Sequence, residues 1–232
     1  MIDWHSHILP GVDDGSADIE ESLSLINSLS SQGVDTVVAT PHFYANDESV
    51  QSFISRRQKA FDSLVPFLSP DSPDILLGAE VRYYQGISHL EGLRDLRLQN
   101  GRILLIEMPM SAWTESMIRE LVDITSFGGV RVVLAHIERY LRFQKHGVLS
   151  RLLEGGVLMQ SNAAFFTSFS TKNKALKLLR NGNIHFIGSD CHNLSSRPPV
   201  ISKAFEVISN KLGHDFLSQM DSFAHDRLNT RV

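Results

Sequence analysis

The sequence has a single cysteine, Cys191, among 232 residues, and little excess charge of either sign. One thiol cannot form an intramolecular disulfide, so the chain fits a reducing compartment. The 22 basic and 26 acidic side chains give a formal charge of −4. This balance lacks the basic footprint of a nucleic-acid-binding protein, and we expect no nucleic-acid partner.

Long apolar runs are also missing. No stretch approaches the roughly 18 consecutive apolar residues that span a bilayer. The N-terminus has no apolar segment behind a basic start, as a secretory signal would. We therefore expect a cytoplasmic protein without direct membrane insertion. The length favours a single domain over residues 1–232, because α/β barrels of this size are single domains.

Short apolar runs alternate with amphipathic segments along the whole chain. The seven runs cover residues 2–5, 35–42, 75–80, 103–107, 130–136, 157–162 and 184–190. Helical spacing predicts helices over residues 17–32, 48–67, 115–127, 172–180 and 200–228, with a short helix ending near 154. Ser16 is the expected N-cap of the first helix, and Gly213 is expected to interrupt the last.

This alternation predicts an α/β fold of parallel strands joined by right-handed crossovers. The runs are almost continuously apolar, as in strands that are buried on both faces. A closed barrel is the economical arrangement. A doubly wound open sheet is the alternative, and the absence of a glycine-rich phosphate loop after the first run weakens it.

The N-terminal stretch 3–16 contains the first candidate ligands. His5 and His7 are two residues apart, and such residues point to the same face of a strand. Both imidazoles can therefore reach one metal ion. Turn-forming residues follow and place Asp13 and Asp14 in a loop just past the strand.

Six of the seven runs carry His, Asp or Glu at or next to their C-terminal ends. In a parallel barrel these ends share one rim, where the active sites of such barrels lie. Burying so many ionisable groups without counter-ions is costly, so divalent cations are expected. At roughly four ligands per ion, the set implies two or three ions, with manganese, iron and zinc all suitable. The nine candidate ligands are His5, His7, Asp14, His42, Glu80, Glu107, His136, Asp190 and His192.

Two arginines follow these runs in the rim loops. Arg139 and Arg197 are expected to project above the metals and to bind phosphate, because guanidinium pairs bidentately with phosphate oxygens. A loop salt bridge is the alternative for each. The histidines outside this pattern are assigned to surface or core roles. They are His89, His146, His185, His214 and His225.

These motifs resemble those of the PHP (polymerase and histidinol phosphatase) superfamily. Within it they are similar to the bacterial metal-dependent protein-tyrosine phosphatases of capsule and exopolysaccharide gene clusters. The resemblance covers residues 3 to about 199, and the remaining C-terminal stretch is less distinctive. It rests on Asp3-x-His5-Ser6-His7 with Pro10-Gly11-Val12-Asp13-Asp14-Gly15-Ser16, Ala39-Thr40-Pro41-His42, Gly78-Ala79-Glu80-Val81-Arg82, Glu107-Met108-Pro109, His136-Ile137-Glu138-Arg139-Tyr140, Ser161-Asn162-Ala163 and Gly188-Ser189-Asp190-Cys191-His192-Asn193.

The resemblance implies a distorted (β/α)7 TIM-like barrel, with manganese favoured as the metal and Arg139 and Arg197 on the phosphoryl group. It implies three ions, held by His5, His7, Glu80 and Asp190, by Glu80, Glu107 and His136, and by Asp14, His42 and His192. The implied substrate is a phosphotyrosine protein, a bacterial tyrosine autokinase. The chain departs from the family pattern at Ile137, Cys191 and Phe165-Phe166, and none of these changes removes a ligand.

Three other functions stay open at this point. Residues 191–197 fit the Cys-x5-Arg spacing of cysteine-dependent tyrosine phosphatases, although no glycine lies between Cys191 and Arg197. A histidinol-phosphate phosphatase, or a nucleotide or nucleic-acid phosphoesterase, would use the same ligands. A regulatory module that only binds a partner is the non-enzymatic alternative.

Overall fold

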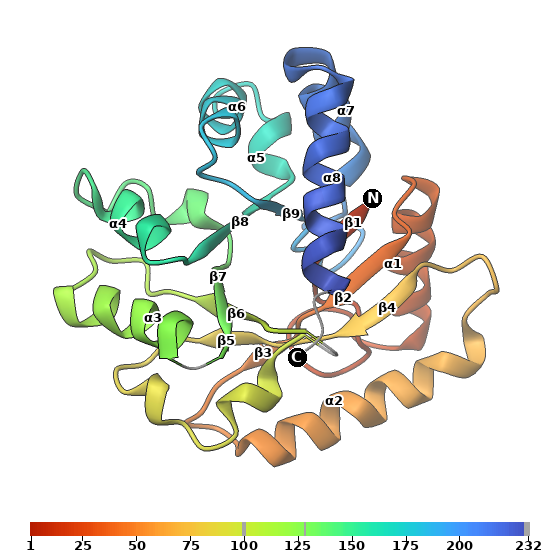
Figure 1. The fold of residues 1–232 in the computed structure, drawn as a ribbon. Coiled ribbons are helices and arrows are strands. Elements are labelled where there is room, and N and C mark those ends of the chain that lie inside the picture. The colour runs from red at the N-terminus through yellow and green to blue at the C-terminus, as the bar shows by residue number, and fades with distance from the viewer. Residues whose placement is uncertain (99–100, 128, 230–232) are drawn as a thin grey trace.

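The strands are short and parallel in the computed structural model, which describes residues 1–98, 101–127 and 129–229. Figure 1 shows them in the middle of the molecule, with helices around them. They are β1 (Ile2–Ser6), β2 (Thr36–Ala39), β3 (His42–Phe43), β4 (Asp74–Leu77), β5 (Glu80–Arg82), β6 (Ile103–Glu107), β7 (Arg131–Leu134), β8 (Leu158–Asn162) and β9 (Phe186–Gly188).

Two of the predicted runs are each broken into two strands. Pro41 has no N–H to donate, and it separates β2 from β3. Gly78 lies at the break between β4 and β5, where a Cβ would come within 3.1 Å of Leu98 Cδ1. The Gly78 N–H donates to the Ala39 carbonyl at 2.8 Å, and the Glu80 N–H donates to the Pro41 carbonyl at 3.0 Å. The two interrupted runs therefore remain paired across their breaks.

The sheet curls until its last strand lies beside its first. The hydrogen-bonded orders are β1-β2-β4 and β3-β5-β6-β7-β8-β9. An isolated parallel bridge joins Ser6 to Cys191, and the Asp190 N–H donates to the His5 carbonyl at 2.7 Å. This is the predicted distorted (β/α)7 TIM-like barrel, and the open doubly wound alternative is wrong.

The helices follow the predicted segments with local differences. They are α1 (Ile19–Ser31), α2 (Val50–Leu64), α3 (Glu115–Phe127), α4 (Val148–Glu154), α5 (Ala164–Thr167), α6 (Lys172–Arg180), α7 (Ile201–Leu212) and α8 (His214–Asn229). Ser16 is not the N-cap of α1; Asp18 is, and its side chain accepts from the Glu21 N–H at 2.9 Å. The helix predicted over 48–67 ends earlier, because Pro66 cannot donate and a 3₁₀ turn, η1 (Val65–Phe67), replaces its last turn.

The interior of the barrel is apolar toward the N-terminal ends of its strands. Ile2, Trp4 and Phe186 belong to one buried cluster, and the rings of Trp4 and Phe186 are 4.0 Å apart. Phe223 and Ala224 of α8 join this cluster, so α8 covers the end of the barrel at which β1 and β9 begin. The opposite end carries the predicted ligands. No helix within the described ranges is long and apolar enough to cross a bilayer.

Candidate metal centre

Glu80, the first residue of β5, lies at the centre of the predicted ligands. Its carboxylate is 3.2 Å from His5 Nε2 and 3.4 Å from His7 Nε2. It also lies 3.1 Å from His42 Nδ1 and 2.8 Å from His136 Nε2. Four imidazoles from three separate parts of the chain therefore surround one buried carboxylate.

Three further carboxylates complete the cluster. Asp190 Oδ1 lies 3.7 Å from His5 Nε2 and 3.6 Å from His7 Nε2. Asp14 Oδ1 lies 3.3 Å from His192 Nε2 and 3.5 Å from His42 Nε2. Glu107 Oε1 lies 3.8 Å from His136 Nε2. The structure thus brings all nine predicted ligands together.

The ligand atoms form three overlapping groups, each lying within 4.8 Å of one another. The groups are His7, Asp14, His42 and His192; His5, His7 and Asp190; and His42, Glu80 and Glu107. The first two contain most of two sets that the family resemblance implies. The third differs, because it joins His42 rather than His136 to Glu80 and Glu107.

The donor atoms of this cluster fit divalent cations. His42 Nδ1 and His192 Nε2 are buried and lie near carboxylate oxygens of Glu80 and Asp14, but neither makes a hydrogen bond of good geometry with the described residues. Leaving such atoms unpaired is costly, and a cation that accepts their lone pairs removes the cost. Burial lowers the pKa of His42, and burial together with the neighbouring His7 lowers the pKa of His192 to about 4. Both imidazoles are therefore neutral near pH 7, which is the metal-binding form.

His7, unlike His42 and His192, favours its protonated form. Burial lowers its pKa, but hydrogen bonds with Asp13 and Glu80 outweigh burial and raise it to about 10. For Glu80, burial alone would raise the pKa of the carboxyl. The charge of His5 and hydrogen bonds from His136, His5 and His7 outweigh burial and lower this pKa well below its usual value. The neighbouring carboxylates therefore favour the protonated form of His7, and a cation bound here would compete with that proton.

The backbone is bent sharply at two of the predicted ligands. His136 has φ 31° and Asp190 has φ 53°, and they are the two non-glycine residues with positive φ among those described. A positive φ costs free energy in a residue that has a side chain, and residues with this conformation gather at functional sites. In β1, one extra residue relative to β2 lies between Asp3 and Ser6, which forms a bulge. The bulge lets Trp4 pack on Phe186 while the next residue, His5, reaches Glu80.

Four residues around the ligands were not predicted. Asp13 Oδ2 lies 2.6 Å from His7 Nδ1, and the same oxygen accepts from the His42 N–H at 2.9 Å. The Gln160 side chain accepts from the His136 N–H at 2.6 Å, and Tyr140 Oη lies 3.1 Å from His136 Nδ1. The Asn162 amide donates to Asp190 Oδ2 at 2.7 Å. These contacts fix the orientations of the predicted ligands, as outer-shell groups do in metal sites.

The sequence held a partial signal for these residues. Gln160 and Asn162 are polar residues in the one apolar run that ends without His, Asp or Glu, and this marks its end as part of the site. Asp13 and Asp14 are adjacent, and only the structure separates the residue that orients His7 from the one that faces His42 and His192.

Both predicted arginines converge on one carboxylate. The Arg197 side chain donates to Asp190 Oδ1 at 2.6 Å, and Arg139 donates to the other oxygen of the same group. The Arg139 side chain is 31% exposed and that of Arg197 is 35% exposed. The two guanidinium groups therefore lie at the mouth of the cluster, each with part of its surface open to solvent.

Cys191 is unsuited to act as a nucleophile. It is fully buried in the apolar layer that also contains Ile187 and Ile201. Burial and the nearby charge of Asp3 raise the pKa of its thiol. A thiolate is the reactive form of cysteine, so this environment disfavours the Cys-x5-Arg chemistry.

Cys191→Ser is therefore expected to keep its turnover. The buried hydroxyl should lower the free energy of unfolding by about 1–3 kcal/mol, since it enters an apolar layer. Turnover, measured well below the unfolding midpoint, should stay close to that of the unsubstituted chain. Complete loss of turnover in a folded, metal-loaded Cys191→Ser protein would contradict this assignment.

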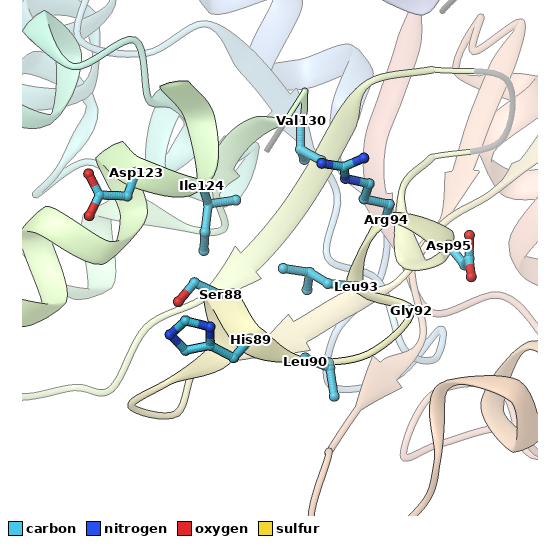
Figure 2. Close-up of a pocket in the computed structure, with 10 residues that line it drawn as sticks. All are labelled: Ser88, His89, Leu90, Gly92, Leu93, Arg94, Asp95, Asp123, Ile124 and Val130. Carbon is cyan, nitrogen blue, oxygen red and sulfur yellow. The ribbon is translucent and has the colours of Figure 1, made fainter. Parts of the chain in front are cut away.

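A separate cavity lies away from these residues. Figure 2 shows it between α3 and the loop that contains the 3₁₀ turns η2 (Ile87–His89) and η3 (Leu93–Leu96), with Ile124 and Val130 on its wall. Its volume is about 740 Å³, and none of the nine predicted ligands lines it. The cavity therefore lies outside the cluster of predicted ligands.

The fold and the ligand cluster define a barrel of the PHP type, and comparison with known proteins gives the family. Residues 1–226 match the family described as capsular polysaccharide synthesis, CpsB/CapC. The chain belongs to this family. It is 32% identical over 240 residues to the tyrosine-protein phosphatase CpsB of Streptococcus agalactiae, covering 95% of this chain and 94% of the relative. It is 30% identical over 222 residues to the tyrosine-protein phosphatase YwqE of Bacillus subtilis, covering 93% and 86%.

Solved structures agree with this assignment. A structure described as YwqE from Bacillus subtilis and CpsB from Streptococcus pneumoniae, unique metal-dependent tyrosine phosphatases, superposes with a TM-score of 0.86 at 25% identity, covering 100% of this chain and 96% of that one. Histidinol phosphate phosphatase from Lactococcus lactis superposes with a TM-score of 0.56 at 16% identity, covering 90% and 92%. The second likeness shows a shared fold alone.

Proposed function

We propose that this chain is a metal-dependent protein-tyrosine phosphatase that acts on a bacterial tyrosine autokinase in the control of capsule or exopolysaccharide synthesis. The observation that carries the proposal is the group of imidazoles and carboxylates around Glu80, with Arg139 and Arg197 at its mouth, in a chain of the CpsB/CapC family. Its relatives are named tyrosine-protein phosphatases, and the similar solved structure is described as metal-dependent.

The ligands are assigned to three ions, with manganese as the proposed metal. His5, His7, Glu80 and Asp190 hold one; Glu80, Glu107 and His136 hold the second; Asp14, His42 and His192 hold the third. The contacts of Glu80 with His5 and His136 support its place in two of these sets. Divalent cations at such a site supply Lewis acidity and lower the pKa of a water.

The protein's own residues orient and neutralise the phosphoryl group. Arg139 and Arg197 have partly exposed guanidinium groups that can turn from Asp190 to phosphoryl oxygens. Their N–H donors would then stabilise the charge that develops on these oxygens during transfer. Asp13 and Tyr140 hold His7 and His136 in place through their Nδ1 atoms.

A comparison of substrates tests the function. The manganese-loaded protein should hydrolyse a phosphotyrosine peptide with a higher kcat/KM than histidinol phosphate or a nucleotide, and elemental analysis should find two to three ions per chain. Preference for histidinol phosphate would replace the proposed substrate, and absence of turnover with every phosphoester would favour a partner-binding module.

We further propose that residues 1–232 form one domain acting in the cytoplasm.

A further inference from the structure

Tyr44 places an exposed aromatic ring at the mouth of the metal centre. It follows β3 directly and lies two residues after His42, with 37% of its surface exposed. Its ring stacks on the imidazole of His42, with centroids 5.4 Å apart and planes inclined by 28°. The ring is therefore fixed beside a proposed ligand while part of it faces solvent.

The backbone holds this ring in a defined position. The Tyr44 carbonyl accepts from the N–H groups of Asp47 and Glu48 at 3.0 and 3.3 Å, in the turn that leads to α2. The Tyr44 hydroxyl makes no hydrogen bond or ion pair with any other residue that the structure describes. Neither hydrogen bonding nor the proposed ligand sets account for an aromatic side chain here.

We propose that Tyr44 is a specificity-determining residue whose ring packs against the phenyl ring of the substrate's phosphotyrosine. This inference rests on the proposed function. In phosphotyrosine the ring begins one bond from the ester oxygen, so a phosphoryl group held near His42 places that ring at the mouth. Aromatic pairs in offset or edge-to-face contact are favourable beyond the area that they bury. A phosphoserine side chain cannot make this contact.

Matched substitutions separate the ring from the hydroxyl. Tyr44→Leu should lower kcat/KM for a phosphotyrosine peptide by about threefold to tenfold, the range expected for one aromatic pair. Its affinity for benzylphosphonate, measured by calorimetry, should fall by the same factor, whereas that for methylphosphonate should not change. Tyr44→Phe should behave like the unsubstituted protein with all three ligands. Phe67→Leu, at an exposed aromatic residue in η1 at the far end of α2, is the matched control.

The outcomes distinguish this inference from the function on which it rests. An unsubstituted protein that hydrolyses no phosphoester contradicts the proposed function. An active protein in which Tyr44→Leu weakens benzylphosphonate and methylphosphonate equally, or neither, contradicts the role of Tyr44. Loss of bound metal in Tyr44→Leu would also contradict it, because the ring would then act by supporting His42. Loss of affinity in Tyr44→Phe would assign the effect to the hydroxyl.

Discussion

Glu80→Gln is expected to lower phosphatase turnover by more than about 100-fold, because outer-shell substitutions alone cost about 10–100-fold in metal sites. Glu80 is 1% exposed, and its carboxylate lies within 3.4 Å of four imidazoles. Glutamine has almost the same shape, but it carries no charge and offers only one oxygen as a ligand. Elemental analysis should find fewer ions per chain, and turnover should match that of the chelated unsubstituted protein.

Glu115→Gln is the matched control for this substitution. Glu115 is 65% exposed and pairs with Arg151 on the surface, and such solvent-screened pairs contribute little to stability. This variant should keep both its metal and its turnover. A Glu80→Gln protein with full metal content and undiminished turnover would contradict the proposed ligand sets.

Arg139→Ala is expected to lower kcat by about 100-fold or more while the metal content stays unchanged, since removing one donor to a developing oxyanion costs about 100–1,000-fold. Arg139 pairs with Asp190 at the mouth of the cluster and keeps 31% of its side chain exposed. Arg139→Lys restores the charge but not the planar fork of donors, so it should recover only part of kcat.

Metal content separates the two possible roles of Arg139. If the arginine acts on the phosphoryl group, kcat falls and the ions remain. If it serves only as the partner of Asp190, the metal content falls together with kcat, and the phosphoryl assignment is wrong. Arg151→Ala, which removes the exposed partner of Glu115, should change neither quantity.

The convergence of the ligands was predictable because it follows from strand periodicity. Eight of the nine candidate ligands stand at or next to the end of an apolar run, Asp14 lies in the loop after the first run, and parallel strands bring these ends to one rim. Helical spacing of the apolar residues likewise predicted α3 and α6 with their observed bounds. A residue pattern alone was therefore enough to place Glu80 beside His136, 56 residues away along the chain.

The structure was needed where neighbouring residues compete for one role. Asp13 and Asp14 are chemically identical, and the turn around them decides which one orients His7. Ser16 and Asp18 are both good helix caps, and Asp18 takes the position next to the first helical residue. The left-handed backbone of His136 and Asp190 has no local sequence signal either, because tertiary contacts impose it.

The contact between the first strand, β1, and the residues that follow the last strand, β9, has a consequence for how the protein is made. His5 and His7 can contact Asp190 only after the last strand has been synthesised. Helix α8 then covers the end of the barrel at which β1 and β9 begin. Contacts between such distant parts of a chain form late and slow its folding. A ribosome must therefore synthesise nearly the whole polypeptide before its first two histidines can reach their final arrangement beside Asp190.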